Sequence, residues 1–214
     1  MKTLDLEHIE VELKKRLQHP YKWLRKQNDL WDTATKFIYK TPDWNTFVSE
    51  METAWRQSSF EKESFIHYAM NRWYNFWSAQ AVEQIFTDLA GVAPNPKPLE
   101  DQYDFRWLGE RFDLKTTVFP KGYGDSYAFA KANPAHLIRW FYENQSTEQR
   151  YHLKNRMFIV CYDQNGEHYK LKAEIGMLKE RVYNYMCERT PADTFSLDLQ
   201  QETETLADII WATR

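Results

Sequence analysis

The stretch that decides the fold reads Tyr103-Asp104-Phe105-Arg106-Trp107-Leu108-Gly109-Glu110-Arg111-Phe112-Asp113-Leu114-Lys115-Thr116-Thr117. Apolar and polar residues alternate on both sides of its centre, and this period of two is typical of half-buried β-strands. We therefore expect a hairpin over about 102–119 with its apolar side chains, Tyr103 among them, on one face. The opposite face then gathers Asp104, Asp113 and Lys115.

The register of this hairpin stays open at the level of sequence. Both apolar sets share one face if the connecting loop has two or four residues, because a one-residue slip turns one strand over. A two-residue loop places Asp104 opposite Asp113, but it also opposes the like charges of Arg106 and Arg111. A four-residue loop places Asp104 opposite Lys115. In both registers the acids and the lysine lie within roughly 5–8 Å of one another.

These charges have an ordinary interpretation as well, in which a solvated sheet face carries cross-strand ion pairs. The acid-x-lysine spacing alone is weak, since Glu12-Leu13-Lys14 also matches it. We expect that second match to lie on a surface helix without a partner carboxylate, and we interpret it as a chance occurrence.

A third carboxylate lies in the helix expected over Phe60–Leu89. Glu83 shares the apolar stripe of this helix with Phe76 and Phe86, so it is expected to point toward the core. Buried carboxylates are normally paired or bound to a metal, because burying an unpaired one is costly. An internal ion pair with a basic residue of the hairpin is the alternative, and Glu63 is a weaker rival for the position.

Composition limits the classes of function. The chain has 214 residues, 43% of them hydrophobic and 16% aromatic, which is typical of a folded protein with a sizeable core. Its 28 Lys and Arg against 31 Asp and Glu give a net charge of −3, so a globally basic nucleic-acid coat is absent. Any contact with nucleic acid must use a local patch.

The cellular setting is inferred from what the sequence contains. Cys161 and Cys187 show neither a paired nor a zinc-type spacing, which favours reduced structural thiols. The N-terminal residues do not resemble a signal peptide, and no apolar run approaches the roughly 18 residues of a membrane span. We expect a soluble cytoplasmic protein with no membrane partner.

The order of expected elements indicates the architecture. Helical spacing covers most of the first 92 residues, and a proline-rich connector follows at 93–98. The expected helices are Leu4–Leu17, Trp23–Tyr39, Trp44–Trp55 and Phe60–Leu89, with later ones at 134–150 and Ile175–Cys187. The further expected strands are Arg156–Tyr162 and His168–Lys172, with a turn at 163–166, and the tail is unassigned except for its apolar run at 206–211. This order favours an α/β fold, with a small mixed sheet flanked by helices in a domain at 59–214 and an all-helical N-terminal extension at 1–58.

The combination of these elements resembles a known superfamily. The helix end Ala79-Gln80-Ala81-Val82-Glu83-Gln84-Ile85-Phe86-Thr87-Asp88-Leu89-Ala90-Gly91, then Asp104 on one strand and Asp113-Leu114-Lys115-Thr116 on the next, is similar to PD-(D/E)XK nucleases. The resemblance covers roughly residues 60–190 and implies the restriction-endonuclease-like αβββαβ core. Tyr103 stands where the motif has proline, and Asp113 stands where glutamate is commoner.

The resemblance implies a metal-dependent nuclease that hydrolyses phosphodiester bonds, with DNA as the expected substrate in a restriction, repair or mobile-element setting. Asp104, Asp113 and the main-chain carbonyl of Leu114 would hold Mg²⁺, or Mn²⁺ in its place. Glu83 would bind the same ion or a second one, or orient a water. Lys115 would position and activate the attacking water. Whether the chain forms a homodimer is left open.

Basic and aromatic residues around the hairpin are candidates for holding the substrate. They are Lys121, Tyr123, Lys131, Arg139, Arg150 and Arg156. The alternative is a solvated helix face and loop. Lys170 and Lys172 would add a basic face to the strand expected at His168–Lys172.

Two other functions remain open. The first keeps the nuclease fold without its chemistry, as a catalytically silent domain that binds nucleic acid or a protein partner. The second is a helical interaction protein whose tryptophan-rich N-terminal region is the binding surface. Intact acids and lysine favour the active enzyme over both.

Overall fold

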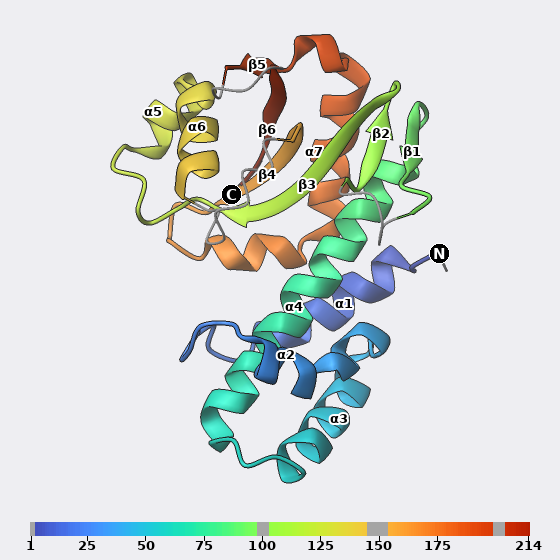
Figure 1. Ribbon diagram of the computed structural model, residues 1–214, viewed down its shortest axis with the longest axis vertical. Helices are drawn as coiled ribbons and strands as arrows, with labels where there is room; N and C mark the ends of the chain where they lie inside the picture. The colour runs from blue at the N-terminus through green and yellow to red at the C-terminus, as the bar shows by residue number, and fades with distance from the viewer. Residues whose placement is uncertain (1–2, 98–102, 145–153, 199–203) are drawn as a thin grey trace. The chain divides into compact units, whose positions relative to one another are not determined.

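The computed structural model describes residues 3–97, 103–144, 154–198 and 204–214 (Figure 1). The chain forms two compact units. The helical unit comprises Met1–Val82 and Lys172–Gly176, and the sheet unit comprises Glu83–Leu171 and Met177–Arg214. The division falls inside a long helix, α4 (Lys62–Thr87). The boundary expected at residue 58 stays a prediction.

The helical unit begins its helices at polar caps. Its elements are α1 (Leu6–Arg16), α2 (Asp29–Ala34), the 3₁₀ helix η1 (Lys36–Lys40), α3 (Trp44–Arg56) and most of α4. Asp5, Asn28 and Asp43 each accept a hydrogen bond from a backbone amide of the following turn, which stabilises the helix start.

The helix expected over Trp23–Tyr39 is correct only in its second half. Residues 17–28 are not helical, and α2 starts after the Asn28 cap. Tertiary packing overrides local propensity here, because Tyr21 and Trp23 place their rings edge-on against aromatic rings of α4, those of Tyr74 and Tyr68.

The sheet unit contains a six-stranded mixed sheet in the order β1-β2-β3-β4-β6-β5, which confirms the α/β class. The strands are β1 (Val92–Pro94), β2 (Phe105–Trp107), β3 (Glu110–Val118), β4 (Arg156–Tyr162), β5 (Phe195–Leu197) and β6 (Thr205–Thr213). The pairs β1–β2, β2–β3 and β5–β6 are antiparallel, whereas β3–β4 and β4–β6 are parallel. The proline-rich connector contributes Pro94 to the edge strand, where a missing amide is tolerated.

Helices cover both faces of this sheet. The described helices are α5 (Tyr127–Ala132), α6 (Pro134–Asn144) and α7 (Ile175–Glu188), with 3₁₀ helices η2 (His168–Ala173) and η3 (Pro191–Asp193). On one face, α6 stacks Phe141 on Phe158 of β4, with centroids 4.8 Å apart. On the other, the end of α4 stacks Phe86 on Phe105 of β2 at the same separation. Among the described residues, no helix has the length and apolar character needed to cross a bilayer.

The strand expected at His168–Lys172 is wrong, because this segment is the 3₁₀ helix η2. The buried carboxylate of Asp163 accepts hydrogen bonds from the amides of Asn165 and Glu167, and its own amide donates to Nδ1 of His168. These hydrogen bonds fix the turn at residues 163–168, which leads into the 3₁₀ helix η2. Lys170 pairs with Glu167 at 2.5 Å, so the expected basic strand face does not form.

The hairpin adopts the two-residue register. Leu108 and Gly109 connect β2 to β3, and their positive φ angles of 49° and 99° are typical of a type I′ turn. Arg106 therefore lies directly opposite Arg111. The register that looked unfavourable on charge is the one that the structure has.

Candidate functional site

A one-residue irregularity shapes the acidic end of the hairpin. Phe112 pairs with Phe105, yet its carbonyl also accepts a hydrogen bond from the amide of Asp104 at 2.9 Å. Two residues of one strand thus oppose a single residue of the other, as in a β-bulge. The bulge moves Tyr103 away from the face of Phe105, where alternation predicts it, and onto the face of Arg111.

The bulge also aims the Asp104 side chain at the neighbouring strand. Its Oδ2 accepts a hydrogen bond from the amide of Leu114 at 2.6 Å. Burial raises the pKa of Asp104 most, the Leu114 amide opposes this, and the charge of Asp113 and a hydrogen bond between the two carboxyl groups raise it further. The charge of Asp113 thus acts on Asp104, and the predicted site formed by the two acids stays a prediction.

Two basic residues that precede or begin β4 accompany this acid pair. Arg156 donates from Nε to Oδ2 of Asp113 at 2.7 Å, as its register partner in the parallel pair β3–β4. Arg156 thus lies within the acid cluster, and its predicted contact with nucleic acid is untested. Burial lowers the pKa of Lys154, and the nearby charges of Asp113 and Asp104 oppose that shift. Lys154 was not among the predicted site residues, although parallel pairing of β4 with β3 places the start of β4 beside the acids of the hairpin.

Leu114 and Lys115 follow Asp113 on β3. Lys115 is exposed and lies two residues beyond Asp113, so the two side chains project from the same face of β3. Leu114 already supplies its amide to Asp104. The role of its carbonyl as a metal ligand stays a prediction.

Glu83 is half-buried near the end of α4. It lies one turn before Phe86, which stacks on Phe105. That face of the hairpin is opposite the one that carries Asp113, so Glu83 would have to approach the acid pair around the sheet edge. Its part in the site stays a prediction.

The candidates for substrate contact have different surroundings. Lys121 and Lys131 are exposed, and Arg139 is exposed while donating to the carbonyl of Asp198 at 3.1 Å. Tyr123 is only 3% exposed and hydrogen-bonds His136 Nδ1 at 2.8 Å, so its ring offers no face to a base. Burial of the ring argues against base stacking by Tyr123, and its predicted contact with nucleic acid is untested. Arg150 lies outside the described residues.

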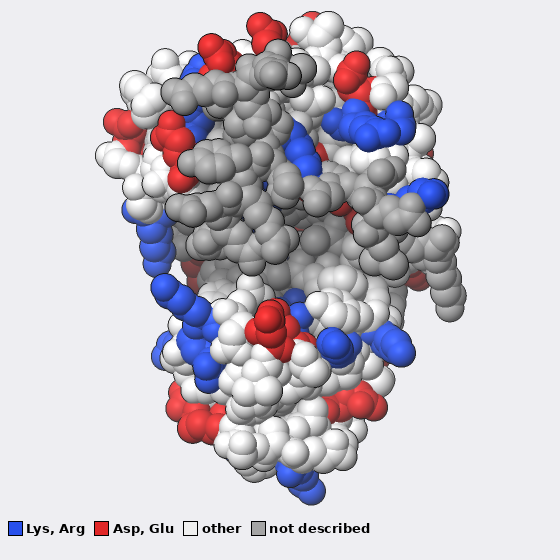
Figure 2. All heavy atoms as spheres, in the orientation of Figure 1, with Lys and Arg blue, Asp and Glu red and all other residues white. Residues whose placement is uncertain are grey.

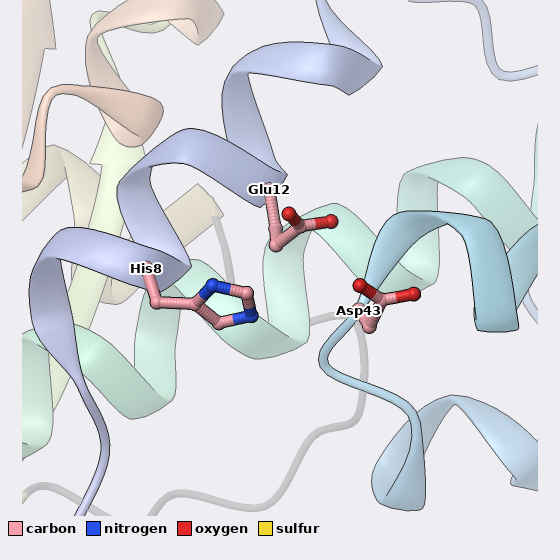
Figure 3. Close-up of side chains that lie close together, drawn as sticks. All are labelled: His8, Glu12 and Asp43. Atoms are coloured by element: carbon pink, nitrogen blue, oxygen red, sulfur yellow. The ribbon is translucent and has the colours of Figure 1, made fainter.

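The helical unit contains a second cluster of possible ligands, formed by His8, Glu12 and Asp43 (Figure 3). Glu12 accepts hydrogen bonds from the Trp44 amide at 2.7 Å and from Lys15 Nζ at 2.5 Å. Asp43 caps α3 at the same point. The two carboxylates therefore stabilise the start of α3, and we interpret the cluster as structural.

This cluster also corrects the interpretation of Glu12-Leu13-Lys14. Glu12 is 3% exposed and has Asp43 close by, whereas we expected an exposed acid without a partner carboxylate.

The chain matches no family model, no curated protein and no solved structure.

Proposed function

We propose that the sheet unit is a metal-dependent nuclease that hydrolyses phosphodiester bonds, with DNA as its substrate. The proposal is supported by the influence of the Asp113 charge on Asp104 and by the position of Lys115, which projects from the same face of β3 as Asp113. Two acids and a lysine in this arrangement provide oxygen ligands for a hard cation and an ammonium group for a water or phosphate oxygen.

The order of elements supports the proposal. A helix, α4, precedes three antiparallel strands, β1 to β3. The helix α6 then leads to β4, which lies parallel to β3. We take this as the αβββαβ arrangement of a restriction-endonuclease-like core, which fits the resemblance to PD-(D/E)XK nucleases.

The residues fit a divalent cation. Mg²⁺ prefers carboxylate and carbonyl oxygens, and Asp104 and Asp113 offer two carboxylates of which one acts electrostatically on the other. Burial raises the pKa of Asp104 most, and the nearby charge of Asp113 adds to that shift. The ion would be held by these two acids and the carbonyl of Leu114, and Glu83 would be a further ligand only if its side chain reached the acid pair around the sheet edge. When bound, it supplies positive charge at the scissile phosphate and acidifies a water ligand.

Three further residues, Lys115, Leu114 and Arg156, would each have a separate role in the reaction. Lys115 positions the attacking water and stabilises negative charge that develops on the phosphate oxygens. The amide of Leu114 fixes the Asp104 carboxylate in place. Arg156 holds Asp113 by its 2.7 Å ion pair, and it must share or release that carboxylate for a cation to bind.

The same ion pair favours a second candidate, a catalytically silent nuclease-like domain that binds nucleic acid or a protein. Arg156 pairs with Asp113, and the charges of Asp113 and Asp104 act on Lys154, so basic groups offset part of the acids' charge without a cation. The two candidates share a fold and differ in whether divalent cations bind the acid pair.

The test is a panel of substrates: supercoiled plasmid, linear duplex, single-stranded DNA and RNA. With Mg²⁺ or Mn²⁺, we expect wild-type protein to cut DNA and Lys115→Met to be slower by about 10²–10⁴-fold, as for loss of general acid–base catalysis. Glu110→Gln, an exposed change on the same strand, serves as the control. Binding without cutting in any metal would favour the silent domain. Cutting that is insensitive to chelation would contradict both.

A further inference from the structure

Two arginines face each other across the hairpin without a counter-ion. Arg106 and Arg111 are register partners, and like charges in directly opposed positions destabilise a sheet. Within the described part of the chain, neither forms a salt bridge with a carboxylate. Asp113, the acid two residues from Arg111, is paired with Arg156 instead.

The ring of Tyr103 holds both guanidinium groups. The Cζ atoms of Arg106 and Arg111 lie 5.3 and 5.0 Å from its centroid, and Nε of Arg106 donates to its hydroxyl at 3.2 Å. Such cation–π contacts offset part of the repulsion and limit the freedom of the two side chains. Tyr103 is 6% exposed, so the arginines lie over a ring that is itself fixed.

One backbone feature builds this arrangement and the acid pair together. The bulge at Asp104 brings Tyr103 beneath the arginines and directs the Asp104 carboxyl toward Asp113. In Figure 2, basic side chains gather at the upper right, over the β2–β3 hairpin as Figure 1 draws it. Arg106, Arg111 and Asp113 lie on one face of the hairpin, because register partners share a face and residues two apart in a strand do as well.

We propose that Arg106 and Arg111 form a phosphate-binding subsite for the nucleic-acid backbone. A phosphate between them replaces mutual repulsion by charge-assisted hydrogen bonds, and guanidinium groups match phosphate oxygens in a planar, two-pronged geometry. Nε of Arg106 is engaged by Tyr103, which leaves its terminal nitrogens for the ligand. The identity of the ligand as a polynucleotide rests on the proposed function.

The spacing assigns this phosphate a place relative to the reaction. Arg111 and Asp113 are two residues apart on β3, which corresponds to roughly 7 Å. We assign this subsite a phosphate next to the one that is cleaved, because the Tyr103 ring holds both guanidinium groups, whereas Asp113 is paired with Arg156. The subsite then positions the strand without taking part in the chemistry.

Binding measured without cleavage tests the subsite. Fluorescence anisotropy of a labelled duplex, in chelator and over a range of salt, gives Kd and the slope of log K against log salt. We expect Arg106→Gln and Arg111→Gln each to raise Kd by on the order of tenfold, as for a lost charged hydrogen bond. Each should also reduce the salt slope by about 0.9.

Matched variants separate this role from a general effect of charge. Arg181→Gln removes an exposed arginine of α7 in the same unit and should leave both quantities unchanged. Arg111→Lys keeps the charge but loses the planar fork, so Kd should rise while the salt slope is retained. Circular dichroism and the unfolding midpoint of each variant establish that it is folded. Inorganic phosphate as a competitor should displace the duplex from wild-type protein more readily than from the double Gln variant.

The outcomes distinguish this subsite from the proposed function. If both Gln variants bind with wild-type Kd and slope, the subsite is wrong, whatever the nicking activity. If they lose affinity and slope while Asp113→Asn still cuts plasmid at the wild-type rate, the subsite stands and the proposed acid chemistry fails.

Discussion

Replacing Arg156 by glutamine should expose a competition between this arginine and a divalent cation. The ion pair with Asp113 has a 2.7 Å N–O distance, with the side chains 23% and 28% exposed. Exposed pairs contribute about 0.2–1 kcal/mol, and breaking a fully buried pair costs about 3–5 kcal/mol. This partly buried pair lies between those limits, so we expect Arg156→Gln to destabilise the metal-free protein by about 1–3 kcal/mol. For a chain of this length, the midpoint of thermal unfolding should fall by roughly 2–10 °C.

The same substitution should strengthen cation binding. In the variant, Asp113 no longer has Arg156 as a partner, and the acid pair carries more net negative charge. If the cation recovers most of the free energy that the ion pair contributed, its affinity rises by roughly 5- to 100-fold, since about 1.4 kcal/mol corresponds to a factor of ten. Isothermal titration calorimetry with Mg²⁺ and Mn²⁺ measures this change, and thermal unfolding in saturating metal should show the lost stability restored.

Arg181→Gln, which removes an exposed charge from the same unit, should leave metal affinity unchanged and serves as the control. If Arg156→Gln lowers the unfolding midpoint but leaves the cation Kd at the wild-type value, the cation does not bind at Asp113. That outcome would refute the assignment of the metal ligands.

Two further predictions concern stability. Leu108 is 60% exposed and has a positive φ at a turn position that favours asparagine. Leu108→Asn should therefore raise the midpoint of thermal unfolding by roughly 1–4 °C, measured by differential scanning calorimetry. A lower midpoint would show that the packing of the Leu108 side chain matters more than its backbone strain. Burial raises the pKa of Asp208, whose carboxylate accepts from Tyr185, the Ile209 amide and Arg189. Because the folded state then binds a proton more tightly than the unfolded state, wild-type stability should fall relative to Asp208→Asn as pH rises above about 3.8 through the folded-state pKa. Urea unfolding at several pH values measures this difference, and a gap independent of pH would contradict the cause given for the shift.

The hairpin shows what alternation can and cannot predict. The period of two places Phe105, Trp107 and Phe112 on one face, and these three are buried as expected. It also predicts that Asp104 lies near Asp113, but the predicted pairing of Asp104 differs from the one in the structure. The extrapolated register pairs the two acids directly, whereas a bulge offsets Asp104 and redirects its side chain. A bulge depends on which backbone amides and carbonyls form hydrogen bonds. The alternation of polar and apolar residues does not reveal which of these bonds form.

Charge misled the choice of register for a physical reason. The opposed pair Arg106 and Arg111 counts against a two-residue loop when only the two strands are considered. The Tyr103 ring offsets the repulsion, and Tyr103 reaches that position only because of the bulge. The contact of the Tyr103 ring with the two arginines depends on the bulge, so it cannot be predicted when both strands are assumed to be regular.

Segments where tertiary contacts decide the structure were the least predictable. The hydrogen bonds of Asp163 turn 168–173 into a 3₁₀ helix despite the alternating pattern of its residues. The strand β6 was not predicted, because polar residues flank its apolar run in the C-terminal tail. Its apolar residues between Asp208 and Trp211 become buried when β6 pairs in parallel with β4. In contrast, β4 was predicted with its observed bounds, because a continuous apolar run is typical of a strand covered on both faces.

We propose that Asp113 holds the ion on which phosphodiester cleavage depends. The most direct test is the initial rate of plasmid nicking by Asp113→Asn and wild type at saturating Mg²⁺, because this change keeps side-chain size and removes the charge. Loss of metal-assisted charge stabilisation worth several kcal/mol predicts a rate at least about 10³-fold lower. Metal-dependent nicking by Asp113→Asn at the wild-type rate would contradict the account.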